Sequence, residues 1–223
     1  MEIRVLSWNL FHGRAVPPAG HDLLGEYAAV LAGWRWDVAL LQEVPPWWPQ
    51  RLAQAAGASC TRVLTSRNFP LALRRALARR WPDLMRSNGG GANAILVRGA
   101  QIAEHRRRRV RWWPERRMVH AVRLDSGLWA ANMHLTVDHR DRDQADLRRA
   151  LATVLEWSRG APLVFGGDLN QRRPAVAGLE HVAGHVVDHL FVRGLRLVGP
   201  VERLDAGHLS DHVALAVDLA SAS

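Results

Sequence analysis

The sequence is poor in cysteine and has no lysine, and each absence limits what the protein can be. Cys60 is the only cysteine among 223 residues, so neither an internal disulfide nor a zinc site built on cysteine ligands can form. No uninterrupted apolar stretch reaches the ~18 residues that a membrane-spanning helix needs. The first residues, MEIRVLSWNL, carry Glu2 and Arg4 without a long apolar run behind them, unlike a signal peptide. We therefore expect a cytoplasmic protein without a transmembrane segment.

The missing lysine means that all 30 basic side chains are arginines. A preference for GC-rich codons produces the same pattern, so the arginine count alone is weak evidence for a function. The net charge of +9 still attracts polyanions, and the planar guanidinium binds phosphate oxygens in pairs. The excess charge is either an attraction for a phosphate-bearing partner or a by-product of codon usage.

The length and the 48% hydrophobic content suit one globular domain, residues 1–223, with a monomer as the default state. Alternating apolar residues predict strands, and apolar residues three or four apart predict helices. The predicted strands are Ile3–Trp8, Asp37–Gln42, Asn93–Val97, Gln101–Val110, Met118–Leu124, Leu128–His134, Pro162–Phe165, Val186–Val192, Leu195–Val201 and Val213–Leu219. The predicted helices are Leu23–Leu31, Leu71–Trp81 and Arg140–Trp157, and Gly89–Gly91 predicts a flexible break. Strands in clusters with few helices between them favour two packed sheets flanked by helices.

Polar residues stand at the ends of several apolar strands, where a plain core would not need them. Each has an ordinary explanation, since asparagines satisfy turns and a glutamate at a strand end can pair with an arginine. Together they supply the oxygen ligands that Mg²⁺ prefers and the acid, base and donor groups that phosphoester hydrolysis requires. These residues are Asn9, Glu43, Asn132, His134, Asp168, Asn170, Asp188, Asp211 and His212.

Six segments that contain these residues resemble the endonuclease/exonuclease/phosphatase (DNase I-like) superfamily, and they occur in the order of that family. The segments are Leu6–Asn9, Leu41–Glu43, Asn132–Leu135, Gly166–Asn170, Val187–Val192 and Ser210–His212. The resemblance implies an α+β fold, a four-layer αββα sandwich of two packed mixed β-sheets flanked by helices. It also places the site at the mouth between the two sheets.

The resemblance implies a divalent cofactor, Mg²⁺ or Mn²⁺, with Glu43 as its principal ligand. Asn9 would support this metal site, and Asp211 would complete it on the other side. A metal in this position would polarise a phosphoryl oxygen.

The catalytic groups follow from the same resemblance. Asp168 would orient or deprotonate the attacking water, and Asn170 would hold the scissile phosphate. His212, oriented by Asp188, would act as an acid or base or as a donor to the phosphoryl oxygens. His134 would contact the phosphate or assist the leaving group. The division of proton transfer between Asp168 and His212 stays open in the sequence.

Two further residues are candidates for binding the substrate. Asn93 follows the glycine-rich break and resembles a Gly-Asn segment of small bacterial members, and Arg117, in the pair Arg116–Arg117, could bring a guanidinium to the phosphate. The competing interpretation is that both belong to a solvated face.

The sequence also departs from one branch of the superfamily. AP endonucleases carry an acidic residue two places after the first asparagine, where this chain has Phe11, and they use an active-site tyrosine. Tyr27 is the only tyrosine here and lies in a predicted helix, while the motif at His134 looks like those of DNase I, sphingomyelinases and inositol 5-phosphatases. AP endonuclease activity is therefore disfavoured.

Clusters of arginine and tryptophan bear on the substrate. Arg106–Arg109 and Arg111 precede Trp112–Trp113, and Trp47–Trp48 lies between prolines. Such a combination suits single strands or the DNA backbone, but arginines also protect an edge strand and tryptophans also pack under loops. Three hypotheses remain open: a phosphodiesterase or nuclease, a phosphatase or phospholipase-C-like hydrolase of a lipid headgroup or sugar phosphate, and a non-catalytic binding module.

Overall fold

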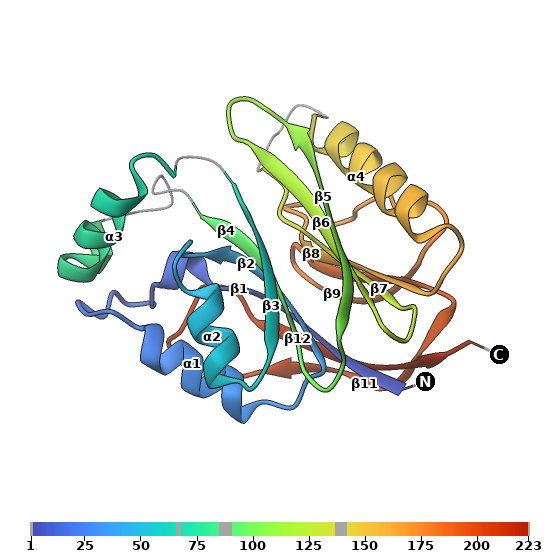
Figure 1. The fold of residues 1–223 in the computed structure, drawn as a ribbon, viewed down its shortest axis with the longest axis horizontal. Helices are drawn as coiled ribbons and strands as arrows, with labels where there is room; N and C mark the ends of the chain where they lie inside the picture. The colour runs from blue at the N-terminus through green and yellow to red at the C-terminus, as the bar shows by residue number, and fades with distance from the viewer. Residues whose placement is uncertain (1, 66–67, 85–90, 137–141, 223) are drawn as a thin grey trace.

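The computed structural model describes residues 2–65, 68–84, 91–136 and 142–222. Two six-stranded sheets pack face to face in it (Figure 1). The first sheet has the order β11 (Leu195–Leu204), β12 (Ala214–Ser221), β1 (Glu2–Asn9), β2 (Val38–Val44), β4 (Ala92–Val97), β3 (Ser59–Leu64). The second has the order β5 (Ile102–Arg111), β6 (Arg117–Leu124), β7 (Trp129–Met133), β8 (Leu163–Asp168), β10 (Asp188–Arg193), β9 (Glu180–His185).

The two sheets repeat one pairing scheme, in which a single parallel pair is flanked on both sides by antiparallel pairs. The parallel pairs are β1 with β2 and β7 with β8. Asn9 lies opposite Gln42 in the first pair, and Asn132 lies opposite Gly166 in the second. Because parallel strands end at the same edge of a sheet, each sheet presents two neighbouring carboxyl ends there.

Helices cover the outer faces and complete four layers (Figure 1). The helices α1 (Leu24–Gly33) and α2 (Pro49–Ala55) pack on the first sheet, and α4 (Arg142–Ser158) packs on the second. An apolar cluster fills each of the three interfaces, with Trp8 of β1 and Tyr27 of α1 in the first, Val5 between the sheets and Phe165 under α4. The predicted αββα sandwich is therefore confirmed.

One helix does not belong to these layers. The helix α3 (Leu71–Arg80) and the 3₁₀ turn η2 (Pro82–Leu84) stand to one side of the sandwich (Figure 1). A second 3₁₀ turn, η1 (Phe11–Gly13), follows β1 directly. Among the described residues, no helix combines the length and the apolar character that crossing a membrane requires.

A polar staple joins the two sheets behind the mouth. The Asn132 Nδ2 of β7 donates to the backbone oxygens of Leu41 and Ala94 in the opposite sheet, at 2.9 Å each. The Gln42 Nε2 donates to Asn132 Oδ1 at 2.8 Å. Gly167 lies beside this staple with a φ of 128°, and a Cβ there would meet the backbone oxygen of Met133 at 2.1 Å. Only glycine fits so close an approach.

The sequence did not predict α2, β3 or β9. In α2, Pro49 occupies the first turn, where the missing N–H costs nothing. The segment Ser59–Leu64 lacks an alternating pattern, and Glu180–His185 is half polar and contains a glycine. These two strands lie at sheet edges, where burial imposes little pattern.

Three other predictions need comment. The strand predicted at Val186–Val192 was wrong at its start, because Val186 has a φ of 54° and forms the turn before β10. Trp48 does not offer a stacking surface, since it is buried against Tyr27 with ring centroids 5.3 Å apart. The helix predicted from Arg140 begins at Arg142, while residues 140–141 and the glycines at 89–90 lie outside the described residues.

Candidate active site

Five strands bring polar side chains to one mouth between the sheets. The parallel pairs contribute Asn9 and Glu43 from the first sheet and Asp168 with the adjacent His134 from the second. The neighbouring strand β10 begins with Asp188. The segment before β12 adds the last two predicted residues, Asp211 and His212. Residues that are up to about 200 positions apart in sequence therefore meet at one edge of the fold.

Asp168 is the buried carboxylate at the centre of this mouth. Its Oδ2 accepts a hydrogen bond from Asn9 Nδ2 at 2.8 Å, and its Oδ1 accepts one from the backbone N–H of Asn170 at 2.9 Å. Asp188 lies directly opposite on the neighbouring strand. Burial and the like charge of Asp188 raise the pKa of Asp168 to about 6.

His212 bridges the two aspartates. Its Nδ1 lies 2.8 Å from Asp188 Oδ2, and its Nε2 lies 3.8 Å from Asp168 Oδ2 and 3.9 Å from Asp211 Oδ1. Burial alone would lower the pKa of His212, but the hydrogen bond to Asp188 and the surrounding negative charges raise it to about 9. At neutral pH the ring is therefore a cation with one nitrogen fixed by Asp188.

Glu43 reaches the mouth through a break in its strand. The ladder between β2 and β4 shifts register between Leu41 and Val44, and Glu43 takes a positive φ of 50°. Such a bulge redirects the side chain out of the regular strand face. Its carboxylate lies 3.1 Å from His12 Nε2 and 3.7 Å from His134 Nε2. Burial, with the charge of Asp168, raises the pKa of Glu43 to about 7.

His134 stands between the two acidic groups. Its Nε2 lies 3.4 Å from Asp168 Oδ2 as well as 3.7 Å from Glu43 Oε1. Burial, aided by the positive charge of Arg117, holds the pKa of His134 well below its usual range. The ring is neutral at physiological pH, so it can donate one hydrogen bond and accept another.

The two candidate substrate-binding residues, Arg117 and Asn93, also fall in or beside the mouth. Arg117 is buried, and its Nε donates to Thr136 Oγ1 at 2.8 Å while an Nη donates to Glu115. Burial lowers the pKa of Arg117, whereas the carboxylates of Glu115, Glu43 and Asp168 act in the opposite direction. Asn93 is 1% exposed, and neither atom of its amide has a hydrogen-bond partner among the described residues.

Strained backbone is concentrated around the mouth. His12, Glu43, Asn170 and Ser210 have φ values of 55°, 50°, 50° and 67°. Non-glycine residues avoid this left-handed region because their Cβ clashes with the backbone, at a cost of about 1 kcal/mol or more each. Strain retained at four neighbouring positions is typical of a functional site.

The sequence missed His12 and Ser210. His12 follows Asn9 by three residues and contacts Glu43, so its place in the segment after the first motif was an available signal. Ser210 donates from Oγ to the backbone oxygen of Asn9 at 2.6 Å and thereby ties the last loop to the first strand. Other predicted residues are brought together differently than expected. Asn170 uses its Nδ2 on the backbone oxygen of Leu135, and Asp211 stands at the exposed rim.

Among the described residues, one group of side chains has its candidate cation ligands close together. It consists of Asp168, Asp188 and His212, whose ligand atoms all lie within 4.8 Å of one another. The carboxylate of Glu43 lies beside it, 3.7 Å from His134 Nε2, which is itself 3.4 Å from Asp168 Oδ2. Burial, together with neighbouring negative charge, raises the pKa values of the carboxylates of Glu43 and Asp168. A divalent cation stabilises the ionised form of carboxylates in such an environment. The donor set of carboxylate and amide oxygens fits Mg²⁺ or Mn²⁺.

The sequence matches the endonuclease/exonuclease/phosphatase family over residues 6–212. The chain belongs to this family. Its members generally hydrolyse phosphoester bonds and typically depend on a divalent metal.

Solved structures of this family's fold superpose on nearly the whole chain. The human Nocturnin catalytic domain with bound sulfate shares 18% identity, with a TM-score of 0.74 and coverage of 99% of this chain and 95% of that one. An endonuclease/exonuclease/phosphatase from Beutenbergia cavernae shares 19% identity, with a TM-score of 0.72 and coverage of 99% of this chain and 72% of that one. TDP2 from Caenorhabditis elegans shares 17% identity, with a TM-score of 0.68 and coverage of 98% of this chain and 74% of that one. These identities establish the fold alone, and no curated protein sequence matches.

Proposed function

We propose that this protein is a divalent-metal-dependent phosphodiesterase that hydrolyses its substrate by in-line attack of water. The observation that carries the proposal is the set of hydrogen-bonded groups around Asp168. A carboxylate fixed by two N–H donors lies within 3.8 Å of a histidine that is held as a cation. Groups of opposite charge and opposite proton-transfer role, placed side by side in a buried mouth, suit acid–base chemistry.

The metal is assigned to Glu43, supported by Asn9 and Asp211, and is Mg²⁺ or Mn²⁺. When bound, it supplies positive charge to a phosphoryl oxygen and to the leaving oxygen. The alternative group around His212 suits a cation less well, because Asp188 Oδ2 is already 2.8 Å from the imidazole Nδ1. A protonated His212 would also repel the ion.

The proton transfers are assigned to Asp168 and His212. The oxygen of water forms the new bond to phosphorus while its proton passes to Asp168, which is ionised at neutral pH. The bond from phosphorus to the leaving oxygen breaks as that oxygen takes a proton from His212 Nε2. Asp188 holds the Nδ1 of His212 so that Nε2 faces Asp168 and the mouth.

The remaining predicted residues are assigned to the phosphate. The unpartnered amide of Asn93 and the buried guanidinium of Arg117 supply donors to the phosphoryl oxygens. Neutral His134, between Glu43 and Asp168, contacts the phosphate from the same side. Asn170 positions Asp168 through its backbone N–H. Its side-chain amide, which also donates to the backbone oxygen of Leu135, contacts the scissile phosphate.

The test is hydrolysis of bis-p-nitrophenyl phosphate in buffer containing Mg²⁺ or Mn²⁺. Activity should disappear with EDTA, return when the metal is restored in excess, and fall about 10²–10⁴-fold in His212→Ala. The matched control is Arg196→Ala, an exposed position on β11, which should keep full activity. Unchanged hydrolysis in His212→Ala would overturn the assigned mechanism, and metal-independent hydrolysis would overturn the cofactor.

The class of substrate separates the remaining candidates. A nuclease would cleave plasmid DNA or single strands, while a phosphatase or phospholipase-C-like enzyme would act on inositol phosphates or sphingomyelin. A single metal-supplemented screen of these substrates distinguishes the two. A non-catalytic binding module would bind without turning any of them over, a result that would remove the enzyme proposal.

A further inference from the structure

The helix α3 contributes no buried residue to the packed layers of the protein. None of its ten residues is buried, although six of the ten residues in its sequence, LALRRALARR, are leucine or alanine. Large apolar side chains stand exposed on and beside it, with Phe69 exposed to 89%, Leu84 to 67% and Trp81 to 53%. We call the exposed apolar residues of this segment the apolar arm; they are Phe69, Leu71, Leu73, Trp81 and Leu84.

Described residues before and after the apolar arm, Thr65, Asn68 and Gly91, lie beside the candidate active site. At its base, the backbone N–H of Thr65 donates to the backbone oxygen of Gly91 at 3.0 Å, and Asn68 Nδ2 donates to the same oxygen. Gly91 packs against His12, since a Cβ on Gly91 would lie 3.4 Å from His12 Nδ1. His12 in turn contacts Glu43. A short chain of contacts therefore links the arm to the proposed metal ligand.

A second exposed apolar element stands close by, in the turn between β5 and β6. Trp112 is exposed to 72% and Trp113 to 79%. The same turn leads to Arg116, whose Nη2 donates to the backbone oxygen of Thr65 at 2.7 Å at the base of the arm. Figure 1 shows α3 and this turn projecting from the same end of the sandwich. Two apolar projections thus flank one mouth.

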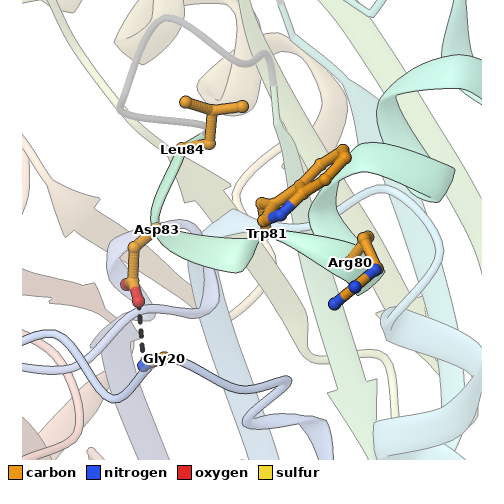
Figure 2. Close-up of a pocket in the computed structure, with 5 residues that line it drawn as sticks. All are labelled: Gly20, Arg80, Trp81, Asp83 and Leu84. Carbon is orange, nitrogen blue, oxygen red and sulfur yellow. Dashed lines mark hydrogen bonds between the residues drawn. The ribbon is translucent and has the colours of Figure 1, made fainter.

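The charge on this surface is positive. The helix α3 carries four arginines and no acidic residue, and its last two residues, Arg79 and Arg80, are exposed. The nearby carboxylate of Asp83 accepts a hydrogen bond from the backbone N–H of Gly20 (Figure 2). Arg80, Trp81 and Leu84 line an open hollow of about 570 Å³ at this place. Guanidinium groups therefore stand beside apolar side chains.

We propose that the apolar arm and Trp112–Trp113 dock on an anionic lipid bilayer and present its phosphoester headgroups to the site. Leucine, tryptophan and phenylalanine beside four arginines, with Asp83 as the single acidic residue between Phe69 and Leu84, form the pattern of a segment that lies in a membrane interface. Bases of a nucleic acid stack on aromatic rings but gain little from leucine, so Leu71, Leu73 and Leu84 favour the lipid. The reaction rests on the proposed phosphodiesterase activity, whereas the docking does not.

The test is sedimentation of the full chain with vesicles, read also by tryptophan fluorescence. Vesicles of phosphatidylcholine mixed with phosphatidylserine should bind the protein and shift its emission to the blue. Vesicles of phosphatidylcholine alone should bind at least about tenfold more weakly, since each arginine near an anionic surface contributes substantially. Equal binding to both, or to neither, overturns the proposal.

Matched variants locate the binding surface. Arg79→Glu with Arg80→Glu should weaken binding by about tenfold or more, while Arg196→Glu with Arg203→Glu, the same change of charge on exposed β11, should not. Leu73→Ser with Leu84→Ser should weaken binding and remove the blue shift without unfolding the protein, because both residues are exposed. Equal loss in both arginine pairs would mean non-specific attraction and would overturn the assignment.

Two further measurements separate this proposal from the proposed function. Vesicle binding should persist in His212→Ala, because docking does not need the catalytic histidine. A wild-type protein that binds vesicles but hydrolyses no substrate would refute the proposed activity and leave the docking proposal intact. Tighter binding to single-stranded DNA than to vesicles, lost in Leu73→Ser with Leu84→Ser, would reassign the surface to nucleic acid and overturn the lipid proposal.

Discussion

Two asparagines on facing sheets are almost completely buried, yet their hydrogen bonding is opposite. Asn132 of β7 uses its amide in three bonds to the other sheet, whereas Asn93 of β4 has no partner for either amide atom among the described residues. Burying an amide without a partner costs about 1–3 kcal/mol. The hydrogen-bonded amide of Asn132 therefore indicates a residue that stabilises the structure. The unpartnered amide of Asn93 indicates a residue that could bind a ligand.

The same contrast extends to the residues around each asparagine. Near Asn132 the backbone is tightly packed, and Gly167 is needed because a side chain would strike the strand beside it. Near the mouth, carboxylates are buried together, with raised pKa values, and strained φ angles recur. Most of the positive φ angles of non-glycine residues and the raised carboxylate pKa values are found at this edge, which separates the function of the edge from the stability of the layer behind it.

The largest effect should come from the mouth. Asp168→Asn removes the proposed proton acceptor without changing its shape, so kcat should fall about 10²–10⁴-fold. The free energy of unfolding should change by no more than about 1 kcal/mol, since a buried charge opposite Asp188 is lost as well. Steady-state kinetics and urea unfolding check this. A variant that unfolds would place Asp168 with the structural residues instead.

The second largest effect should come from the staple. Asn132→Ala removes the donor to the backbone oxygens of Leu41 and Ala94 and one of the two acceptors of Gln42 Nε2. We expect a loss of about 2–4 kcal/mol in the free energy of unfolding, measured with urea. The matched control is Asn93→Ala, the same substitution at an equally buried site. Equal destabilisation by the two variants would remove the distinction between the asparagines.

The third effect depends on pH. The folded pKa of His212 is raised to about 9 from an ordinary value of 6.5, so its stabilisation is fully present below pH 6.5 and is lost as the pH rises through 9. The wild type should therefore exceed His212→Gln by at most about 3 kcal/mol at pH 6 in metal-free buffer. The gap should shrink by pH 10, and a gap that stays constant with pH would contradict the charge assigned to this ring.

The smallest effect concerns Asn93. Because its amide has no partner to lose, Asn93→Ala should leave the free energy of unfolding within about 1 kcal/mol of the wild type. Loss of a donor to the phosphate should lower kcat/KM about tenfold or more. Kinetics with bis-p-nitrophenyl phosphate measures this, and unchanged kcat/KM would show that the amide does not meet the substrate.

The predictions from sequence were strongest where chemistry and periodicity coincide. The parallel pairs β1–β2 and β7–β8 are apolar runs that end in Asn9, Glu43 and Asp168, so both the strand and the polar residue closing it are visible in one segment. The strand pattern favoured two packed sheets, while the four-layer sandwich and the grouping of these residues at one edge were implied by the family resemblance. Edge strands such as β3 carry no such pattern and were missed.

Other parts of the site depend on contacts that sequence does not display. The bulge that redirects Glu43 is set by its pairing with β4, and His12 reaches Glu43 only because the chain turns sharply after Asn9. Asn132 and Asn93 look alike in the sequence, and only the facing sheet decides which of them is satisfied. Tertiary contacts, rather than local preference, determined these outcomes.

The pairing of the first strand with the last determines at which stage of folding this site is assembled. β1 lies between β2 and β12, and Ser210 closes the loop onto Asn9 across 201 positions. During synthesis Asn9 emerges early, while His212 and its partner strand emerge among the last residues of this sequence. Contacts of such long separation form late in folding. The proposed phosphodiesterase chemistry would therefore begin only once β12 has docked.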